Sequence, residues 1–248
     1  MLVSVDIGNT TIHLSVIQNG MAVGSFRLPT GEDYTRQSLL DKLTPLIPRD
    51  AEGSVLSSVV PPLTKLFSEC LGLLLGKEPL VISHELDLGI RLGVDFPEKV
   101  GPDRLVDAAW AAEKYGVPVI TADLGTATTV NVVDENRVFR GGIICAGVTT
   151  GIRALDKDCA ALDSTPLGQS PVLIGTNTAQ AMESGALLGT AALLEGLVRR
   201  IRQQLGREVP LVVTGGHSRL VCPHLLLEHI HDPYLLPQGL AYLYRRNS

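Results

Sequence analysis

The sequence predicts an α/β protein built from two similar domains, each with a mixed β-sheet and flanking helices. The first observation is a strand–turn–strand–turn–strand pattern at residues 2–28 that recurs at 117–144. The second is that turn residues recur at one constant offset along the chain, namely Asp6 with Asp123, Gly8 with Gly125 and Asn19 with Asn136. The third is that helical and strand patterns alternate after each meander. Two such domains are expected to face each other across a ligand-binding cleft.

The first half is expected to open with a hairpin meander. Small-residue turns at 8–11 and at Asn19-Gly20 separate three apolar runs, which is typical of β-hairpins. Prolines at 61–62 and Gly76 mark the start and end of one helix. In order, we expect strands at 2–7, 12–17 and 21–28, a helix at 32–47, a strand at 53–60, a helix at 61–76, a strand at 79–83, a loop-rich segment at 84–102 and a helix at 103–116.

The second half is expected to repeat the meander and then continue with a long helix. Its second turn is expected at Glu135-Asn136. A helix is predicted at 176–206 with Thr178 as its cap, followed by a strand at 209–216 and a helix-rich tail. We place the boundary between the halves near residue 115, a position that no low-complexity linker marks. The expected domains are therefore 1–115 and 116–248.

Composition limits the classes of function. With 45% hydrophobic residues among 248, the chain can bury a substantial core. The formal net charge is -5, and lysine and arginine form no run longer than Arg199-Arg200 and Arg245-Arg246. We therefore expect no nucleic-acid partner. No apolar run approaches the ~18 residues that a membrane span needs, so we expect no membrane partner.

Cysteine usage and the N-terminus indicate the compartment. Four cysteines, Cys70, Cys145, Cys159 and Cys222, are scattered without a CxxC pair or histidines at zinc-ligand spacing. Buried free thiols in a reducing compartment are therefore expected. The N-terminal residues carry no charged segment, and Asp6 interrupts the apolar stretch, so we expect no signal peptide and a cytoplasmic protein.

The turn at 6–11, Asp-Ile-Gly-Asn-Thr-Thr, concentrates groups that bind phosphate. Gly8 lets the backbone approach a ligand, and the amides that follow it can serve as anion donors. Asp6 repels phosphate itself, so its natural role is to hold a hydrated divalent cation that screens the phosphate charge. An ordinary hairpin with polar turn residues is the alternative for a single loop. The second copy, at Asp123, favours a pair of ligand-binding loops.

A third loop, Thr214-Gly215-Gly216, follows the apolar residues 209–213. Its glycines would let a nucleotide base or ribose lie against the backbone. Because glycine pairs end many strands, this loop alone is weak evidence for a nucleotide site and counts only together with the other two loops.

The tetrapeptide Gly101-Pro102-Asp103-Arg104 places a carboxylate beside a guanidinium. Phosphoryl transfer needs in-line positioning, charge screening and a base near the attacking hydroxyl, and Asp103 suits the last role. Arg104 can grip a carboxylate in a fork. The alternative is structural, with Asp103 as a helix N-cap and Arg104 as a first-turn surface residue. Three carboxylates, Asp6, Asp103 and Asp123, would repel each other in one cleft, so a bound cation is expected.

Together these loops resemble the phosphate and adenosine motifs of the actin-like ATPase and sugar kinase superfamily. Within it, the chain is similar to the type III pantothenate kinases. The matching motifs, in the family order, are Asp6 to Thr10, SSVVPPL at 57–63, Gly101 to Arg104, Asp123 to Ala127, Gly141 to Ile144, GTNTAQAMESG at 175–185 and VVTGG at 212–216. The resemblance implies two duplicated actin-like (ribonuclease H-like) domains with mixed sheets flanking an ATP cleft.

The resemblance also implies ATP-dependent phosphorylation of pantothenate to 4'-phosphopantothenate, the first step of coenzyme A biosynthesis. It implies ATP with Mg2+, a monovalent cation (K+ or NH4+) and a homodimer. The residues it assigns to ATP are Asp6, Ile7, Gly8, Asn9, Thr10, Thr11, Ile12, His13, Thr126 and Gly215. Those it assigns to pantothenate are Gly101, Pro102, Asp103 as proton acceptor, Arg104 on the carboxylate, and Thr178 from the neighbouring subunit. It implies that Asp123 holds the monovalent cation and that Asp6 holds Mg2+ through water.

Two positions depart from the family pattern. Val94 stands where the family usually has a tyrosine that contacts pantothenate, and Phe96 offers a ring without a hydroxyl. Ala146-Gly147 replaces a Pro-Gly pair. Two alternatives therefore stay open: a kinase of the same fold acting on another small alcohol, and a non-catalytic nucleotide-binding transcriptional accessory factor. Retention of Asp103 argues against the second, because a pure sensor needs no base.

Overall fold

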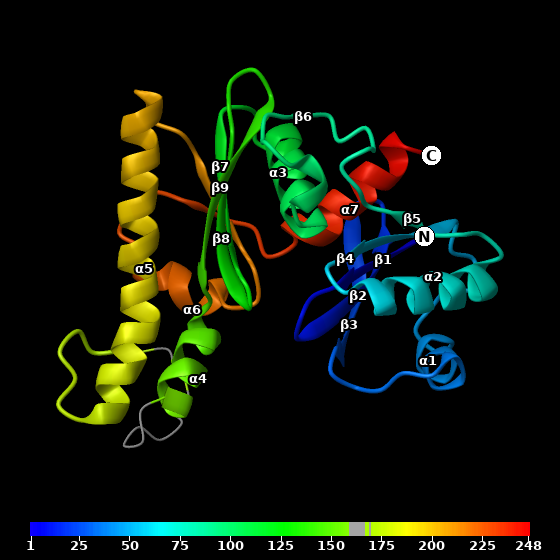
Figure 1. Ribbon diagram of the computed structural model, residues 1–248, viewed down its shortest axis with the longest axis horizontal. Coiled ribbons are helices and arrows are strands. Elements are labelled where there is room, and N and C mark those ends of the chain that lie inside the picture. Colours follow the sequence, from blue (N-terminus) through cyan, green and yellow to red (C-terminus); the bar gives the residue numbers. More distant parts are fainter. Residues whose placement is uncertain (159–166, 169) are drawn as a thin grey trace. The chain divides into compact units, whose positions relative to one another are not determined.

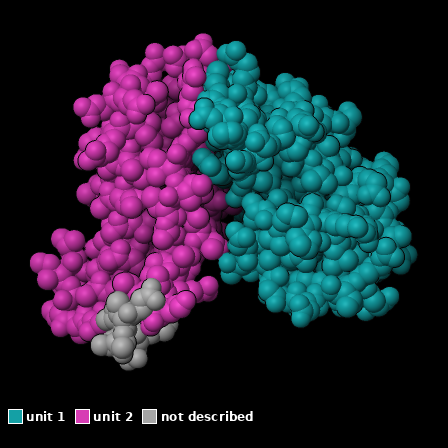
Figure 2. All heavy atoms as spheres, in the orientation of Figure 1, with its two compact units in different colours: residues 1–114, 137–139, 234–248 teal, residues 115–136, 140–233 magenta. Residues whose placement is uncertain are grey.

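The computed structural model describes residues 1–158, 167–168 and 170–248 (Figure 1). The chain divides into two compact units (Figure 2). Unit 1 comprises Met1–Lys114, Arg137–Phe139 and Tyr234–Ser248, and unit 2 comprises Tyr115–Asn136 and Arg140–Pro233. The first junction falls next to the boundary expected at residue 115. The C-terminal segment, however, packs with unit 1, whereas the sequence division assigned it to a domain at 116–248.

The first sheet lies in unit 1. Its strands, in spatial order, are β3 (Met21–Pro29), β2 (Thr11–Gln18), β1 (Leu2–Ile7), β4 (Gly53–Ser58) and β5 (Leu80–Val81). β1 runs antiparallel to β2 and parallel to β4, so the carboxyl ends of β1 and β4 meet at one edge. The expected opening meander is thereby confirmed. The strand expected at 79–83 is shorter, because only Leu80 and Val81 pair with β4 at the outer edge of the sheet.

Helices cover both faces of this sheet. They are α1 (Arg36–Leu43), α2 (Pro61–Leu75), α3 (Pro102–Lys114) and α7 (Leu235–Arg246), with a short 3-10 helix η1 (Pro97–Lys99) before α3. α1 and α2 bury Leu39 and Phe67 on one face, and α3 and α7 bury Leu105 and Leu240 on the other. α1 is shorter than the helix expected at 32–47. Thr35 caps its start, and Pro45 disfavours helical geometry just beyond its end.

The second sheet repeats the arrangement of the first. Its strands, in spatial order, are β11 (Ile230–His231), β10 (Leu211–Thr214), β7 (Val119–Leu124), β8 (Ala127–Val133), β9 (Val138–Ala146) and β6 (Arg91–Leu92). β7 is antiparallel to β8 and parallel to β10, just as β1 is to β2 and β4. The order β9-β8-β7-β10-β11 matches β3-β2-β1-β4-β5, which confirms the expected duplication. β6 is the addition: it comes from the segment expected to be loop and pairs with Val138 and Phe139, which belong to unit 1.

The helices of unit 2 are α4 (Val148–Asp158), α5 (Thr178–Leu205), α6 (Ser218–Val221) and the 3-10 helix η2 (Cys222–His224). α5 runs along one face of the second sheet and buries Leu187 and Leu194 there (Figure 1). The helix expected at 176–206 is confirmed, but the prediction of Thr178 as its cap is wrong. Asn177 is the cap, because its side chain accepts a backbone hydrogen bond of 2.9 Å from the first turn.

By length and composition α5 could cross a membrane, since an 18-residue window of it has a mean hydropathy of 1.3. Long helices that pack on a sheet meet the same criterion. Of the 18-residue window, 33% is buried, and Leu187, Leu194 and Val198 of α5 lie fully buried in the core of unit 2.

Three of the four cysteines are described, and all three are free thiols. Cys70 and Cys222 are buried as expected, whereas Cys145 is half-buried and Cys159 lies outside the described residues. Burial raises the pKa of the Cys222 thiol to about 11, so this side chain is protonated and packs as an apolar group.

Candidate active site

The turn at 8–11 is held by the end of the β3 segment. Gly8 N donates to Thr11 O at 3.1 Å and closes the turn. Thr30 fastens it, because its Oγ1 donates to Gly8 O at 2.8 Å and its N donates to Thr10 O at 3.1 Å. Thr10 and Asn9 at the tip are exposed. The turn is therefore fixed at its base and leaves its polar tip accessible to a ligand.

A polar row crosses the first sheet at this end. Asp6 on β1 lies in register with Ser57 on β4 and with His13 on β2, and His13 lies in register with Arg27 on β3. Ser57 Oγ donates to Asp6 Oδ1 at 2.8 Å. Burial lowers the pKa of His13, and the positive charge of Arg27 lowers it further, so the imidazole is neutral at pH 7. The sequence had singled out Asp6 and His13 and had included Ser57 in the motif at 57–63, whereas Arg27 emerges only from strand register.

Asp103 lies in the first turn of α3. Gly101 O accepts the first helical hydrogen bond, from Leu105 N at 3.2 Å, so Gly101 occupies the N-cap position and Asp103 does not. Asp103 Oδ1 accepts a hydrogen bond of 2.9 Å from Arg104 N. A Cβ on Gly101 would lie 2.5 Å from the same oxygen, so the carboxylate folds back over the glycine. Burial raises the pKa of Asp103 above its usual value, although the Arg104 N–H and charge oppose the shift.

Val59 connects the turn at 8–11 with the start of α3. Its N donates to Ile7 O at 3.0 Å, directly after β4 ends. Its Cγ1 lies 3.9 Å from the position that a Cβ on Gly101 would take. The carboxyl ends of β1 and β4 and the start of α3 therefore meet at one edge of the first sheet. This places Asp6 and Asp103 at the same end of unit 1.

Arg104 is oriented by an aromatic ring. Its guanidinium lies 5.7 Å from the ring centroid of Phe139, which is fully buried at the start of β9. Burial lowers the pKa of Arg104, and Asp103 opposes that shift. Phe139 O also accepts a hydrogen bond of 3.0 Å from Gly93 N. Phe139 thus contacts both Arg104 and the segment that carries Val94, and nothing in the sequence pattern had singled it out.

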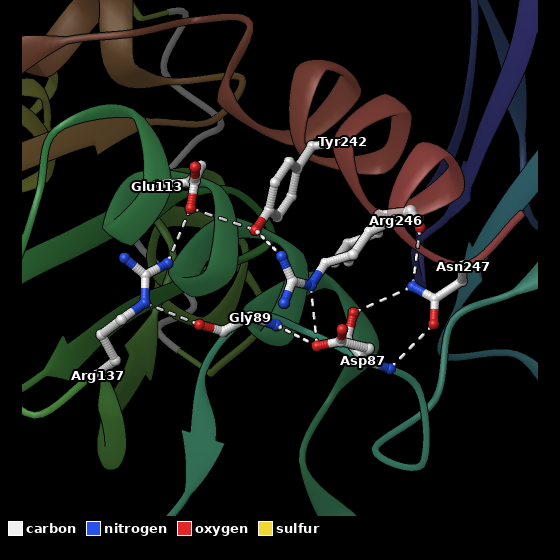
Figure 3. Close-up of polar contacts among 8 residues, drawn as sticks. Asp87, Gly89, Glu113, Arg137, Tyr242, Arg246 and Asn247 are labelled. Carbon is white, nitrogen blue, oxygen red and sulfur yellow. Dashed lines mark hydrogen bonds and ion pairs between the residues drawn. The ribbon is translucent and has the colours of Figure 1, made fainter.

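The acceptor loop, residues 87–101, is anchored at its start by the C-terminal helix. Asp87 Oδ1 accepts hydrogen bonds from Arg246 Nε at 2.8 Å and from Gly89 N at 3.0 Å (Figure 3). The Asn247 side chain binds both backbone groups of the same residue. Its Oδ1 accepts a hydrogen bond from Asp87 N at 2.9 Å, and its Nδ2 donates one to Asp87 O at 3.0 Å. The return of the C-terminus to unit 1 therefore fixes one end of this loop.

Arg137, in the turn between β8 and β9, ties the acceptor loop to the end of α3. Its Nε donates to Gly89 O at 2.8 Å, and its Nη2 pairs with Glu113 Oε2 at 2.9 Å (Figure 3). Tyr242 Oη donates to the same Glu113 oxygen at 3.3 Å. Arg137 has a φ of 58°, a left-handed conformation that is uncommon for a residue with a side chain. Its contacts offset the cost of that conformation.

Asp123 is the penultimate residue of β7, as Asp6 is of β1. It lies in register with Thr214 on β10, as Asp6 does with Ser57. Gly215, with a φ of 97°, packs against it so closely that a Cβ would overlap Asp123 Oδ1 and Leu124 N. The structure therefore brings the second and third glycine loops of the sequence together within unit 2.

The turn that follows Asp123 is held from the start of α4. Thr126 O accepts hydrogen bonds from Gly147 N at 3.1 Å and from Thr150 Oγ1 at 2.6 Å. A Cβ on Gly147 would overlap the carbonyl oxygens of Gly125 and Thr126, so these two oxygens lie together against Gly147. The Thr126 side chain is exposed. Gly147, noted in the sequence only as part of a departure, is what permits this close contact.

The remaining residues of interest are solvent-accessible. Thr178 is exposed as the first residue of α5. Val94 is half-buried in the acceptor loop, and Phe96 is 58% exposed with Lys99 Nζ 4.4 Å from its ring centroid. The loop thus presents an aliphatic side chain and an aromatic side chain, neither of which carries a hydroxyl.

Comparison with known proteins identifies the family and the fold of this chain. A family model described as type III pantothenate kinase matches residues 2–200. A type III pantothenate kinase from Thermomicrobium roseum is 37% identical over 252 residues, covering 99% of this chain and 97% of that protein.

Two solved structures share the fold. A conserved putative Baf family transcriptional activator from Campylobacter jejuni has a TM-score of 0.63 at 16% identity, covering 99% of this chain and 98% of that one. A putative 2-dehydro-3-deoxygalactonokinase from Sinorhizobium meliloti has a TM-score of 0.57 at 12% identity, covering 99% and 96%. These likenesses confirm the expected actin-like fold class. The matched residues 2–200 and the 37% identity along nearly the whole length show that the chain belongs to the type III pantothenate kinase family.

Proposed function

We propose that this protein transfers the γ-phosphoryl group of ATP to the primary hydroxyl of pantothenate, giving 4'-phosphopantothenate in the first step of coenzyme A biosynthesis. Family membership along the full length supports the reaction. The observation that carries the proposal is Asp103. It is a half-buried carboxylate whose partial burial raises its pKa, and it lies at the same sheet end as the turn at 8–11.

On the acceptor side, Asp103 takes the proton of the attacking hydroxyl. Burial makes its carboxylate a stronger base than an exposed aspartate, which suits general base catalysis. Arg104, held against the ring of Phe139, pairs with the pantothenate carboxylate in a fork. Gly101 and Pro102 let the substrate approach this turn of α3. The acceptor loop forms the remaining wall of the pantothenate site.

On the donor side, backbone amides and threonine hydroxyls of the turn at 8–11 bind the phosphates of ATP. Ile7, Ile12 and His13 flank that turn on β1 and β2. Asp6 with the neighbouring Ser57 hydroxyl offers hard oxygen donors, which fit Mg2+ held through water. When bound, Mg2+ neutralises charge that develops on the phosphoryl oxygens.

In unit 2, the oxygen atoms around Asp123 fit a monovalent cation, K+ or NH4+. The carboxylate lies against Gly215, and the carbonyls of Gly125 and Thr126 lie together against Gly147. Thr126 O already accepts two hydrogen bonds, so the Asp123 carboxylate is the ligand on which this assignment rests. We assign the exposed Thr126 side chain to an ATP contact and the Gly215 backbone to the adenosine.

We further propose a cytoplasmic homodimer in which Thr178 reaches the pantothenate of the neighbouring subunit. The exposed apolar side chains before α5 support an interface there, since Leu173 and Ile174 are 80% and 82% exposed. The cytoplasm is where the phosphoryl donor ATP is available. Sedimentation of the purified protein tests the dimer, and a monomer at all concentrations would contradict it.

ATP turnover with pantothenate, measured with and without K+ or NH4+, tests the function. We expect turnover that requires pantothenate and rises with the monovalent cation. Turnover with another small alcohol but not with pantothenate would favour the alternative suggested by Val94. ATP binding without turnover on any alcohol would favour a nucleotide-binding accessory factor.

A further inference from the structure

We propose that Arg27 binds the phosphate chain of ATP beside the turn at 8–11. The residue lies outside the segment 6–13 that the sequence pattern assigns to ATP. This inference rests on the proposed function, because it adds Arg27 to the residues that bind ATP in the same reaction.

Strand register places Arg27 third in the polar row that begins at Asp6. Asp6 on β1 lies opposite His13 on β2, which lies opposite Arg27 on β3. Residues directly opposite on neighbouring strands project from the same face of a sheet. Two strand spacings of about 4.8 Å separate the backbones of Arg27 and Asp6. An extended arginine side chain spans most of that distance, so its guanidinium can reach a ligand held over Asp6.

The face that carries this row is the one on which α3 packs. Leu2 and Asp6 project from the same face of β1, because side chains alternate along a strand. Leu2 belongs to the core cluster that contains Leu105 of α3. Arg27 and Asp103 therefore lie on the same side of the first sheet. Phosphoryl transfer requires the phosphates of ATP and the base that activates the acceptor hydroxyl to lie on the same side of the sheet.

Arg27 is a cation without an acidic partner in the part of the chain that the structure describes. Its side chain is exposed, and its charge acts on His13. Because His13 is neutral, the row has a carboxylate at Asp6 and a positive charge at Arg27. A guanidinium offers a rigid fork of N–H donors that matches phosphate oxygens. The triphosphate of ATP is thus the ligand that this cation fits.

Calorimetric titration of ATP with Mg2+, in the absence of pantothenate, tests the assignment. We expect Arg27→Met to weaken ATP binding by about tenfold or more, while binding of AMP, which lacks the β- and γ-phosphates, stays within about twofold. Arg27→Lys is expected to lose less affinity, because it keeps the charge but not the fork. Arg49→Met, which removes another exposed arginine of unit 1, serves as the matched control and should bind ATP like the wild type.

Two further readouts separate ligand binding from a structural role. The thermal midpoint of Arg27→Met should equal that of the wild type, and its KM should rise for ATP but not for pantothenate. ATP affinity in Arg27→Met equal to that of Arg49→Met would overturn the inference. If the wild type binds ATP in an Arg27-dependent way but phosphorylates no pantothenate, the proposed function fails and this inference stands.

Discussion

Ser57 Oγ donates a hydrogen bond of 2.8 Å to Oδ1 of Asp6, from the strand that runs parallel beside it. The second sheet places Thr214 beside Asp123 at the equivalent register position. Each duplicated half therefore sets a hydroxyl-bearing residue next to the aspartate near the end of its first strand. A hydroxyl that donates to a carboxylate stabilises the ionised form and limits the orientations of the carboxylate.

Ser57→Ala is predicted to weaken the donor side. It removes a hydrogen bond to a charged group. Because Asp6 is only half-buried, we expect the loss to cost about 1 kcal/mol, which corresponds to an increase of about fivefold in the KM for ATP with Mg2+. The KM for pantothenate should change little. Ser54→Ala is the control, since Ser54 on the same strand is buried and its Oγ has no hydrogen-bond partner among the described residues. Equal effects of both variants would contradict a role for Ser57 in holding Asp6.

Asp103→Asn is predicted to reduce turnover by about 10²-fold or more, because the amide cannot accept the proton. ATP binding should stay within a few fold. The raised pKa means that ionised Asp103 is disfavoured in the folded state. This destabilisation is absent at pH values below the pKa that Asp103 has in the unfolded chain, and it is fully present above the pKa that Asp103 has in the folded protein. The variant should therefore be at least as stable as the wild type at pH 7.

The same pKa shift gives a prediction for wild-type kinetics. The rate should fall as pH decreases through the pKa of Asp103, so the acidic limb of the pH profile should lie above 3.8, the ordinary pKa of an aspartate side chain. An acidic limb at or below that value would argue against Asp103 as the base.

Val94→Tyr is predicted to lower the KM for pantothenate. The substitution adds a hydroxyl and a ring to the acceptor loop at a half-buried position. Steady-state kinetics with varied pantothenate at saturating ATP measure the effect. An unchanged KM would mean that this part of the loop does not line the substrate site.

Gly215→Ala is predicted to destabilise the protein by roughly 1–3 kcal/mol and to weaken ATP binding. Its φ of 97° disfavours a side chain, and a Cβ would overlap Asp123 Oδ1 and Leu124 N. Gly216→Ala is the neighbouring control, because a Cβ there meets nothing within 4 Å. Thermal unfolding and ATP titration of both variants check this, and a stable Gly215→Ala with normal affinity would contradict the packing described above.

Arg137→Gly is predicted to raise the KM for pantothenate by about fivefold while changing the KM for ATP little. Glycine adopts the left-handed φ of 58° without strain, so loss of the guanidinium contacts is separated from backbone effects. Asn19→Gly, at a φ of 52° in the β2–β3 turn, provides the matched control. If the two variants behaved alike, Arg137 would not position the acceptor loop.

Local patterns in the sequence were sufficient for the duplicated meanders, because hairpin turns and apolar alternation are encoded within a few residues. The repeated Asp-x-Gly motif also identified Asp6 and Asp123 at equivalent ends of the two sheets. The sequence assigned Gly215 and Asp123 to separate loops, and only the structure shows that the two residues are in contact.

Contacts between distant segments were not predictable in the same way. β6 is only two residues long, and its partner in β9 lies far along the chain. The C-terminal helix joins unit 1 by burying Leu240 and Leu243 in the core that contains Leu105, and Arg246 and Asn247 then bind Asp87. No local periodicity reveals these contacts. Phe139 beside Arg104 and Arg27 beside His13 likewise follow from pairing between strands or segments, which local composition does not encode.

The central claim is that Asp103 serves as the base for phosphoryl transfer from ATP to pantothenate. Mass spectrometry of the products, with equal amounts of wild-type protein and Asp103→Asn supplied with ATP, Mg2+, K+ and pantothenate, tests it most directly. We expect singly phosphorylated pantothenate from the wild type and almost none from the variant. Absence of that product from the wild type, or equal yields from both proteins, would contradict it.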